Sequence, residues 1–186
     1  MPMPARIIIL NGSSSVGKTS TAKAIQQFAS SAFMHLQMDS FLEMLPKRLD
    51  NHVDGLLFQN IGSDESPEIA VSSGPALQKL MSGMRGAVAA MASHDNNIVV
   101  DDVLWDQKDF DEYRDLLTEF DLKFVLLDAP LDVIEHRERS RGDRTLGLAR
   151  WQFDRVRNYQ NYDLIVDTLD SDVESCAKKI VAAFGL

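Results

Sequence analysis

The sequence has a single cysteine, Cys176, among its 186 residues. One thiol cannot close an intramolecular disulfide, which is typical of proteins from a reducing compartment, and we expect this thiol to be an inert helix residue. No apolar run approaches the ~20 residues that a membrane-spanning helix needs. The N-terminal residues lack the cationic leader and apolar segment of a secretion signal. We therefore expect a cytoplasmic protein without a membrane partner.

Positive charge is also scarce, because 19 Lys and Arg residues face 28 Asp and Glu residues, for a net charge of −9. A surface that binds DNA or RNA normally carries a basic face, so no nucleic-acid partner is expected. The histidines have no metal-ligand spacing. The chain has neither the Asn-Lys-x-Asp segment that selects guanine nor a switch glutamine in an Asp-x-x-Gly context. These absences disfavour nucleic-acid processing and molecular-switch functions.

An apolar stretch, Ile7–Asn11, runs directly into the pattern G-x-x-x-x-G-K-T. Small residues let successive backbone N–H groups turn inward and hold phosphate oxygens, while the following helix points its positive end at the same anion. Lys18 is expected to place a cation on the β- and γ-phosphates, and the Thr19 hydroxyl to ligate Mg²⁺. A merely structural Gly/Ser turn is the alternative. The pattern predicts an ATP·Mg²⁺ site at Gly12, Ser13, Ser14, Ser15, Val16, Gly17, Lys18, Thr19 and Ser20.

Apolar runs alternate with helical patterns along the chain, which is typical of a parallel sheet with crossover helices. We expect strands at Ile7–Asn11, Met34–Met38, Ile98–Asp102, Lys123–Leu127 and Leu164–Val166. We expect helices at Lys18–Ser30, Pro75–Ser93, Asp109–Glu119, Pro130–Ser140, Leu148–Tyr159 and Asp172–Phe184. The length suits one domain over residues 1–186. The expected architecture is a three-layer α/β phosphate-loop fold with a central parallel sheet.

Residues 46–74 form the irregular part of the chain. Gly55–Gln59 and Glu68–Val71 could pair as a hairpin across the polar segment between them. A connection this long inside a compact domain is usually functional or mobile. We expect an insertion that builds the acceptor site, with an unstructured surface loop as the alternative.

Two acidic residues end the third expected strand. In phosphate-loop proteins such an acid lies beside the loop and holds Mg²⁺, often through water, and Asp101 is assigned this metal role because it comes first after the apolar run. Asp102 points to the opposite side and is expected to face the substrate. Trp105 follows closely and is expected to line the acceptor pocket, or else to pack in the core. The alternative for the acidic pair is that two acids simply end a strand.

Asp39 ends the second expected strand, followed by Ser40. Ligands of parallel sheets bind at the carboxyl ends of the strands, so Asp39 is expected to share a crevice with Lys18 and Asp101. An acceptor hydroxyl must lose its proton as it attacks the γ-phosphate, and a carboxylate within reach can take it. The alternative role is an N-cap for a helical segment that begins at Ser40.

Residues 137–147 concentrate arginines in an otherwise acidic chain, and their helix is expected to break at Gly142. Guanidinium groups can form paired hydrogen bonds to phosphate oxygens and offset the charge that builds up during transfer. We expect an arginine lid in which Arg141 and Arg144 act on the phosphate, with Arg137 on the face of Arg141 and also near the nucleotide. Arg139 is expected to face solvent. A solvated basic helix face is the alternative.

These motifs, taken in order, resemble the chloramphenicol phosphotransferase-like family. The resemblance lies in Ile8–Lys18, Asp39-Ser40, Ser73-Gly74-Pro75, Asp101-Asp102-Val103, Arg137–Arg144 and Tyr162–Thr168. It implies a nucleoside-kinase-like P-loop fold, ATP-dependent phosphorylation of a hydroxyl on a small molecule, and an acceptor-activating aspartate that maps onto Asp39. The correspondence is weak over Pro46–Ser72, where an acceptor pocket is expected.

The sequence therefore predicts a small-molecule kinase that uses ATP and Mg²⁺. Its expected catalytic residues are Asp39, Lys18, Arg141 and Arg144, and its expected substrate-binding residues are Asp39, Ser40, Asp102 and Trp105. The resemblance points to chloramphenicol 3-O-phosphorylation. The alternatives are a kinase of another metabolite, nucleoside or sugar nucleotide, and a nucleotide-binding regulatory module with slow hydrolysis. The sequence leaves homo-oligomerisation open.

Overall fold

The computed structural model describes residues 4–142, 145–158, 161–169 and 171–186. Its main sheet has five parallel strands in the order β2 (Phe33–Gln37), β5 (Asn97–Asp101), β1 (Arg6–Asn11), β6 (Asp121–Asp128) and β7 (Leu164–Asp167). The central strand β1 pairs with β5 on one side and β6 on the other. The strand order therefore reverses at β1, and ligands of open parallel sheets bind at such a switch point.

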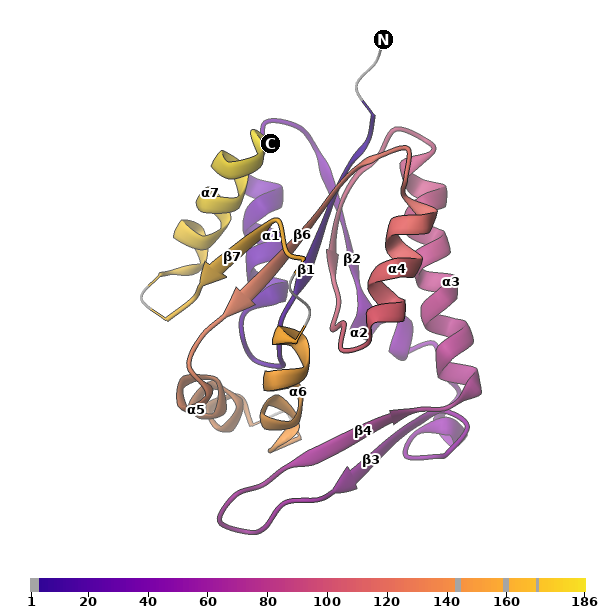
Figure 1. Ribbon diagram of the computed structural model, residues 1–186, viewed down its shortest axis with the longest axis vertical. Coiled ribbons are helices and arrows are strands. Elements are labelled where there is room, and N and C mark those ends of the chain that lie inside the picture. Colours follow the sequence, from indigo (N-terminus) through magenta and orange to yellow (C-terminus); the bar gives the residue numbers. More distant parts are fainter. Residues whose placement is uncertain (1–3, 143–144, 159–160, 170) are drawn as a thin grey trace.

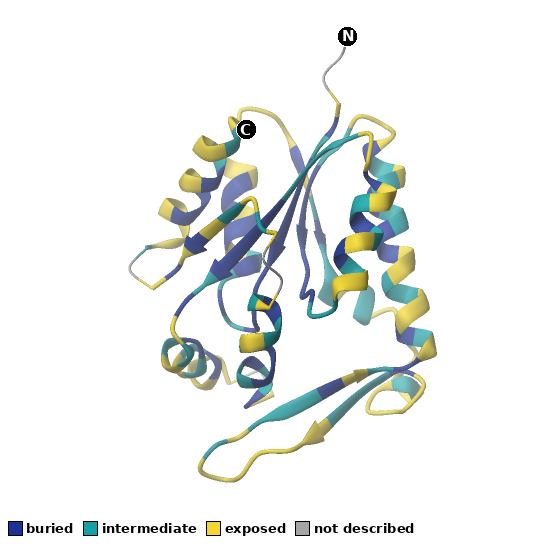
Figure 2. Ribbon diagram, in the orientation of Figure 1, coloured by how far each residue is buried: buried dark blue, intermediate teal, exposed yellow. Residues whose placement is uncertain are grey.

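Helices cover both faces of this sheet, so the expected three-layer α/β fold is confirmed (Figure 1). Helices α1 (Lys18–Phe28) and α7 (Val173–Phe184) cover one face, and α3 (Pro75–Ala92) and α4 (Gln107–Leu116) cover the other. Because side chains alternate along a strand, Ile8 and Leu10 pack toward the first pair of helices while Ile7 and Ile9 pack toward the second. The inner strands β1 and β5 are mostly dark blue in Figure 2 because both of their faces are buried.

The smaller elements gather at the carboxyl ends of the strands, in the lower half of Figure 1. They are α2 (Met38–Leu42), the 3₁₀ turn η1 (Lys47–Leu49), the antiparallel hairpin of β3 (Leu56–Asn60) and β4 (Ile69–Ser73), α5 (Leu131–Arg141) and α6 (Leu148–Arg157). The expected hairpin in 46–74 is therefore present. It is held from the other end of the chain, since the Ile69 N–H donates to the Gly147 carbonyl at 3.0 Å.

Two expectations about acidic residues need correction. Asp39 does not end β2, which stops at Gln37, but lies in the first turn of α2. The N-cap position of α2 is Gln37, so Asp39 is not a helix cap either. Asp102 lies one residue beyond β5, although its N–H still donates to the Leu10 carbonyl at 3.1 Å. Among the described residues no helix is long and apolar enough to cross a membrane.

Candidate active site

The loop between β1 and α1 has the backbone conformation of a phosphate cradle. Gly12 has φ 148°, and a Cβ there would lie 2.6 Å from the Leu127 carbonyl oxygen, so only glycine fits. Gly17 has φ 107°, and Ser15 is a non-glycine residue in the left-handed region at φ 63°. Alternation of right- and left-handed residues turns consecutive N–H groups to one side, which makes an anion-binding concavity.

Several polar groups of this loop fit a phosphate. No side chain among the described residues caps the N-terminus of α1, whose N-cap residue is Gly17. The Ser15 hydroxyl is buried and has no hydrogen-bond partner among the described residues. The Lys18 ammonium is buried and donates to the carbonyls of Gly12 at 2.9 Å and Ser13 at 3.1 Å, so the cation is folded over the loop. Buried donors of this kind are ready to bind an anion.

Thr19 and Asp101 lie together at the first turn of α1. The Thr19 hydroxyl donates to the Asp101 carboxylate at 2.5 Å, and Asp101 is buried at the end of β5. His35 of β2 lies 3.9 Å from the same carboxylate, and burial lowers the pKa of this imidazole although Asp101 opposes the shift. An oxygen pair of hydroxyl and carboxylate is the donor chemistry that Mg²⁺ prefers. The two residues fit the expected metal role.

Arg137 lies on the other side of the loop, in a cavity of about 330 Å³. Its guanidinium donates to the Thr168 hydroxyl at 3.0 Å and to the Thr168 carbonyl at 2.7 Å. The same cavity is lined by Ser15, Gly17 and the buried Cys176. This cavity therefore opens directly beside the loop between β1 and α1.

A larger cavity of about 580 Å³ lies between α2, the hairpin, α3, α4 and α6. Asp39, Asp102 and Trp105 line it, as expected of substrate-binding residues, whereas Ser40 is exposed and lies outside the set of lining residues. Trp105 makes an edge-to-face contact with Trp151 of α6, with centroids 5.6 Å apart. The apolar part of the wall comes from Met38, Leu42, Leu56, Phe58, Val71, Leu77, Met81, Val103 and Leu148.

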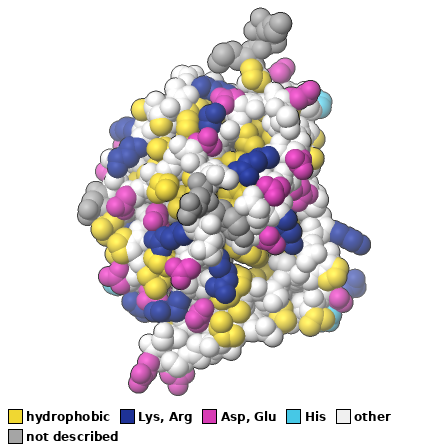
Figure 3. Space-filling view, viewed as in Figure 1, with side chains coloured by type: hydrophobic (Ala, Val, Ile, Leu, Met, Phe, Trp, Pro, Cys, Tyr) yellow, Lys and Arg dark blue, Asp and Glu magenta, His cyan; other side chains and the backbone are white. Residues whose placement is uncertain are grey.

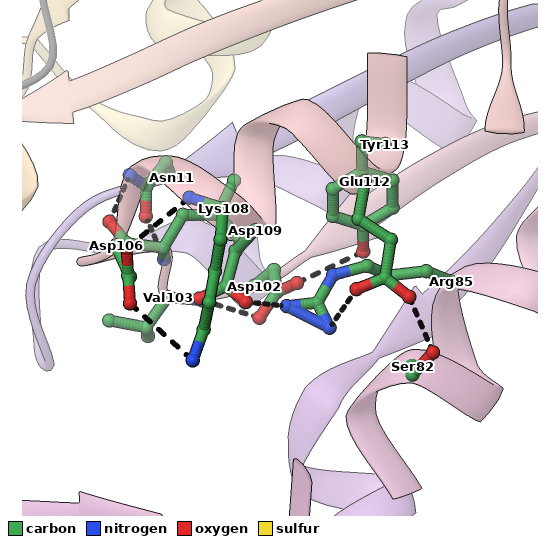
Figure 4. A network of polar contacts seen from close by, with 11 residues as sticks. Asn11, Ser82, Arg85, Asp102, Val103, Asp106, Lys108, Asp109, Glu112 and Tyr113 are labelled. Carbon is green, nitrogen blue, oxygen red and sulfur yellow. Dashed lines mark hydrogen bonds and ion pairs between the residues drawn. The ribbon is translucent and has the colours of Figure 1, made fainter. Parts of the chain in front are cut away.

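A buried polar network forms one side of this cavity (Figure 4). Asp102 accepts hydrogen bonds from the Val103 N–H at 2.7 Å and the Tyr113 hydroxyl at 2.9 Å. Burial raises the pKa of Asp102, although the nearby Arg85 and these two bonds oppose the shift. Arg85 itself pairs with Asp109 and lies 3.4 Å from Glu112. Both oxygens of Asp102 are therefore engaged by fixed donors.

The arginine-rich end of α5 breaks at Gly142, which caps the helix in the left-handed conformation at φ 69°, as expected. Arg139 and Arg141 are exposed there, and Arg144 lies outside the described residues. Arg137 differs from both because Thr168 holds it against the body of the protein. On the face shown in Figure 3, Lys and Arg side chains are interspersed with Asp and Glu rather than gathered into one basic patch.

Sequence reasoning missed Gln152 and Glu138, which are both buried polar residues. The Gln152 side-chain carbonyl accepts the Ser14 N–H of the phosphate loop at 2.7 Å, and Gln152 also lines the larger cavity. The two oxygens of Glu138 accept the N–H groups of Gly147 at 2.8 Å and Ala149 at 2.9 Å, so α5 holds the start of α6. The sequence shows that both are polar residues on the apolar face of a helix, but it does not show which groups they bond to.

Comparisons with known proteins agree with this geometry. A Mycobacterium tuberculosis protein, provisionally named an O-phosphotransferase, is 28% identical over 180 residues that cover 94% of this chain and 80% of that protein. A sugar kinase structure from Janibacter sp. has a TM-score of 0.69 at 17% identity, covering 98% of this chain and 95% of that one. The Mycobacterium tuberculosis APS kinase in complex with AMPPNP and APS has a TM-score of 0.67 at 15% identity, covering both chains fully.

The two structural likenesses concern the fold alone, which is that of P-loop kinases. The family model described as chloramphenicol phosphotransferase-like protein matches residues 5–185. Because this match takes in the phosphate loop, both cavities and the arginine-rich helix, the chain belongs to the chloramphenicol phosphotransferase-like family of P-loop phosphotransferases.

Proposed function

We propose that this protein transfers the γ-phosphate of ATP to a hydroxyl group of a small molecule bound in the 580 Å³ cavity. The observation that carries the proposal is the junction between the cavity and the phosphate loop. Gln152 lines the cavity and at the same time bonds to Ser14 of the loop, so the two spaces meet at one side chain. A bound hydroxyl and a bound phosphate would therefore be neighbours, as in-line transfer requires.

The nucleotide side of the proposal is supported by the start of α1 and the Ser15 hydroxyl, neither of which has a side-chain partner in the described part of the chain, and by the Lys18 ammonium. Thr19 and Asp101 are the residues that would hold Mg²⁺, which when bound neutralises charge on the phosphate oxygens. Arg137 and its cavity are proposed to take the remainder of the nucleotide. Lys18 and the lid residues Arg141 and Arg144 are proposed to offset the charge that spreads over the transferred group.

On the acceptor side, Asp39 is the proposed base. The acceptor O–H gives its proton to the Asp39 carboxylate, the oxygen forms a bond to the γ-phosphorus, and the bond to the β–γ bridging oxygen breaks as ADP leaves. Asp39 is half-buried at the cavity wall. Both oxygens of Asp102 lie deeper and accept bonds from Val103 and Tyr113. Asp102 is therefore better placed to hold the wall than to take a proton.

The wall supports an acceptor with an apolar body and a hydroxyl group. Aliphatic and aromatic side chains make up half of the residues that line the cavity, and the segment 46–74 contributes Leu56, Phe58 and Val71 to them. Chloramphenicol, the compound in the family name, has such a character, and we propose it as the first acceptor to try. The O-phosphotransferase name of the mycobacterial relative also supports transfer to oxygen. The alternatives are another hydroxylated metabolite, nucleoside or sugar nucleotide, and a nucleotide-binding module without an acceptor.

The test is acceptor-stimulated ADP release across a panel of hydroxylated compounds that includes chloramphenicol, nucleosides and neutral sugars. A kinase shows ADP release that rises with one class of acceptor and falls at least about 10²-fold in Asp39→Asn. A module shows slow ADP release that no compound accelerates and that Asp39→Asn leaves unchanged. That second pattern would contradict the proposal.

A further inference from the structure

One backbone N–H group of the phosphate loop is bonded to a side chain that lies 138 positions further along the sequence. Gln152 lies in α6, and its carbonyl oxygen accepts the Ser14 N–H at 2.7 Å in a buried contact. Only 4% of Gln152 is exposed to solvent. An oxygen acceptor on an N–H group of the cradle takes the place that a phosphate oxygen would use. A phosphate oxygen that bound the Ser14 N–H would therefore have to displace the amide of Gln152.

Gln152 is held firmly in this place by its surroundings. The Glu138 carboxylate fixes the start of α6 through Gly147 and Ala149, and Glu138 is itself 2% exposed. The neighbouring Trp151 packs against Trp105 on one side and beneath the Arg155 guanidinium, 4.2 Å from the ring centroid, on another. The contact with Ser14 is thus the result of a fixed helix position rather than of a loose surface side chain.

Gln152 also lines the acceptor cavity, so one side chain touches the nucleotide side and the acceptor side. We propose that the Gln152 carbonyl holds the Ser14 N–H until a nucleotide phosphate takes this donor over, and that the released side-chain NH₂ group donates to the phosphoryl group only in the transition state of transfer. The residue thereby links occupation of the cradle to alignment at the acceptor cavity. This inference rests on the proposed nucleotide site.

Two substitutions separate the two halves of the proposal. Gln152→Met keeps the length of the side chain but removes its acceptor and its NH₂ group, so the competition with phosphate ends. Since a net hydrogen bond corresponds to a factor of roughly two to ten, a non-hydrolysable ATP analogue with Mg²⁺ is expected to bind about two- to tenfold more tightly. Gln152→Glu places a carboxylate on the Ser14 N–H, which binds the donor more strongly and repels phosphate, so the analogue is expected to bind at least about tenfold more weakly.

Gln26→Met is the matched control, because Gln26 also bonds to a backbone group, the Phe33 carbonyl at 2.8 Å, but lies away from both cavities. Titration calorimetry should give this variant the affinity of the parent. If the parent does not bind the analogue, the proposed nucleotide site fails. If the parent binds it and Gln152→Met binds equally or more weakly, the competition is wrong and the nucleotide site stands.

Amide NMR provides a second readout that does not depend on affinity. Without nucleotide, the Ser14 amide resonance of Gln152→Met is expected to differ from that of the parent, because the parent amide donates to Gln152. At saturation with the analogue the two resonances are expected to coincide, because phosphate now accepts this N–H in both proteins. A difference that persists at saturation would show that Gln152 never leaves Ser14 and would overturn the proposal.

Turnover tests the second half. With an acceptor that the parent phosphorylates, kcat of Gln152→Met is expected to fall about 10- to 100-fold while KM for ATP does not rise, since the donor acts only on the transferring group. Gln26→Met is expected to keep both constants. An unchanged kcat in Gln152→Met would show that the Gln152 NH₂ group does not assist phosphate transfer.

Discussion

The phosphate cradle comes from one continuous segment between β1 and α1, whereas the acceptor cavity is assembled from α2, the β3–β4 hairpin, α3, α4 and α6. In the cradle the backbone does the binding, and Gly12 and Gly17 are fixed by positive φ angles. In the larger cavity the side chains form the wall, so a substitution of one wall residue is expected to change the cavity without changing the backbone conformation. The loop of the phosphate cradle is therefore local in the sequence, whereas the wall of the larger cavity is distributed over many segments.

This contrast implies that substitutions on the two sides have different signatures. A change in the cradle is expected to remove nucleotide binding and transfer together. A change in the cavity wall is expected to alter KM for the acceptor while the nucleotide affinity stays constant.

Lys18→Ala is expected to lower transfer by about 10³-fold or more, because it removes the cation that we propose to lie on the β- and γ-phosphates. Steady-state ADP formation with a productive acceptor measures the loss. Lys23→Ala, an exposed lysine of the same helix, is the control and should keep parent activity. Transfer within a few-fold of the parent in Lys18→Ala would contradict the assignment of the nucleotide site.

Asp39→Asn is expected to lower kcat about 10²–10⁴-fold, because the amide keeps the shape of the side chain but cannot take the acceptor proton. Nucleotide affinity and thermal stability should stay near parent values, since Asp39 lies on the acceptor cavity and does not cap α2. Glu43→Gln changes an exposed acid at the end of the same helix and is the control. Parent-rate transfer by Asp39→Asn would move the base role to Asp102.

Phe58→Ala is expected to raise KM for an apolar acceptor about 10-fold, because loss of an aromatic wall residue removes roughly 1–2 kcal/mol of apolar contact. The nucleotide Kd should not change, because the hairpin lies on the acceptor side alone. Gln59→Ala, the exposed neighbour on the opposite face of β3, is the matched control. An equal rise in the nucleotide Kd of Phe58→Ala would contradict the separation of acceptor binding from nucleotide binding.

The smallest expected effect is a pH dependence of stability that comes from the cavity wall. Burial raises the pKa of Asp109, although the ion pair with Arg85 opposes the shift. Asp109 therefore binds its proton more tightly in the folded state than in the unfolded state. The stabilisation that results is fully present at pH values below the ordinary carboxyl pKa. It is lost as the pH rises from about 4 through the raised pKa of Asp109.

Chemical unfolding at a series of pH values measures this effect. The stability of the parent should fall relative to that of Asp109→Asn as the pH rises through this window, because the asparagine cannot titrate. Asp115→Asn removes an exposed carboxylate of the same helix and should run parallel to the parent. A parent curve parallel to that of Asp109→Asn would rule out the raised pKa.

The sequence predicted the sheet, its helices and the phosphate loop because their signals are local. Apolar periodicity located β1, β5 and β6 within a few residues, and the loop pattern depends on neighbouring positions only. The hairpin in 46–74 also followed from two apolar runs around a polar turn. The position of Asp39 was less accurate, since a short helix replaces the end of the expected strand.

Contacts between distant residues were beyond sequence reasoning. Gln152 and Ser14 are 138 positions apart, and Tyr113 meets Asp102 across the start of α4. Helical periodicity places Gln152 on the apolar face of its helix, but it does not identify the partner, because that depends on the packing of α6 against the loop. The part of the cavity wall that comes from α3, α4 and α6 was not predicted for the same reason, whereas Asp39, Asp102, Trp105 and the segment 46–74 were expected there.

Transfer of phosphate to an acceptor is tested most directly by following the γ-phosphate of ATP. The protein is incubated with a productive acceptor and with ATP whose γ-phosphate carries an isotopic label, and the acceptor is then analysed by mass spectrometry. If the protein transfers the γ-phosphate to the acceptor, one labelled phosphate is expected on an acceptor hydroxyl for each ADP formed. No such product is expected with Lys18→Ala or Asp39→Asn. Label that appears only in inorganic phosphate, with the acceptor unmodified while ADP forms, would contradict transfer to the acceptor.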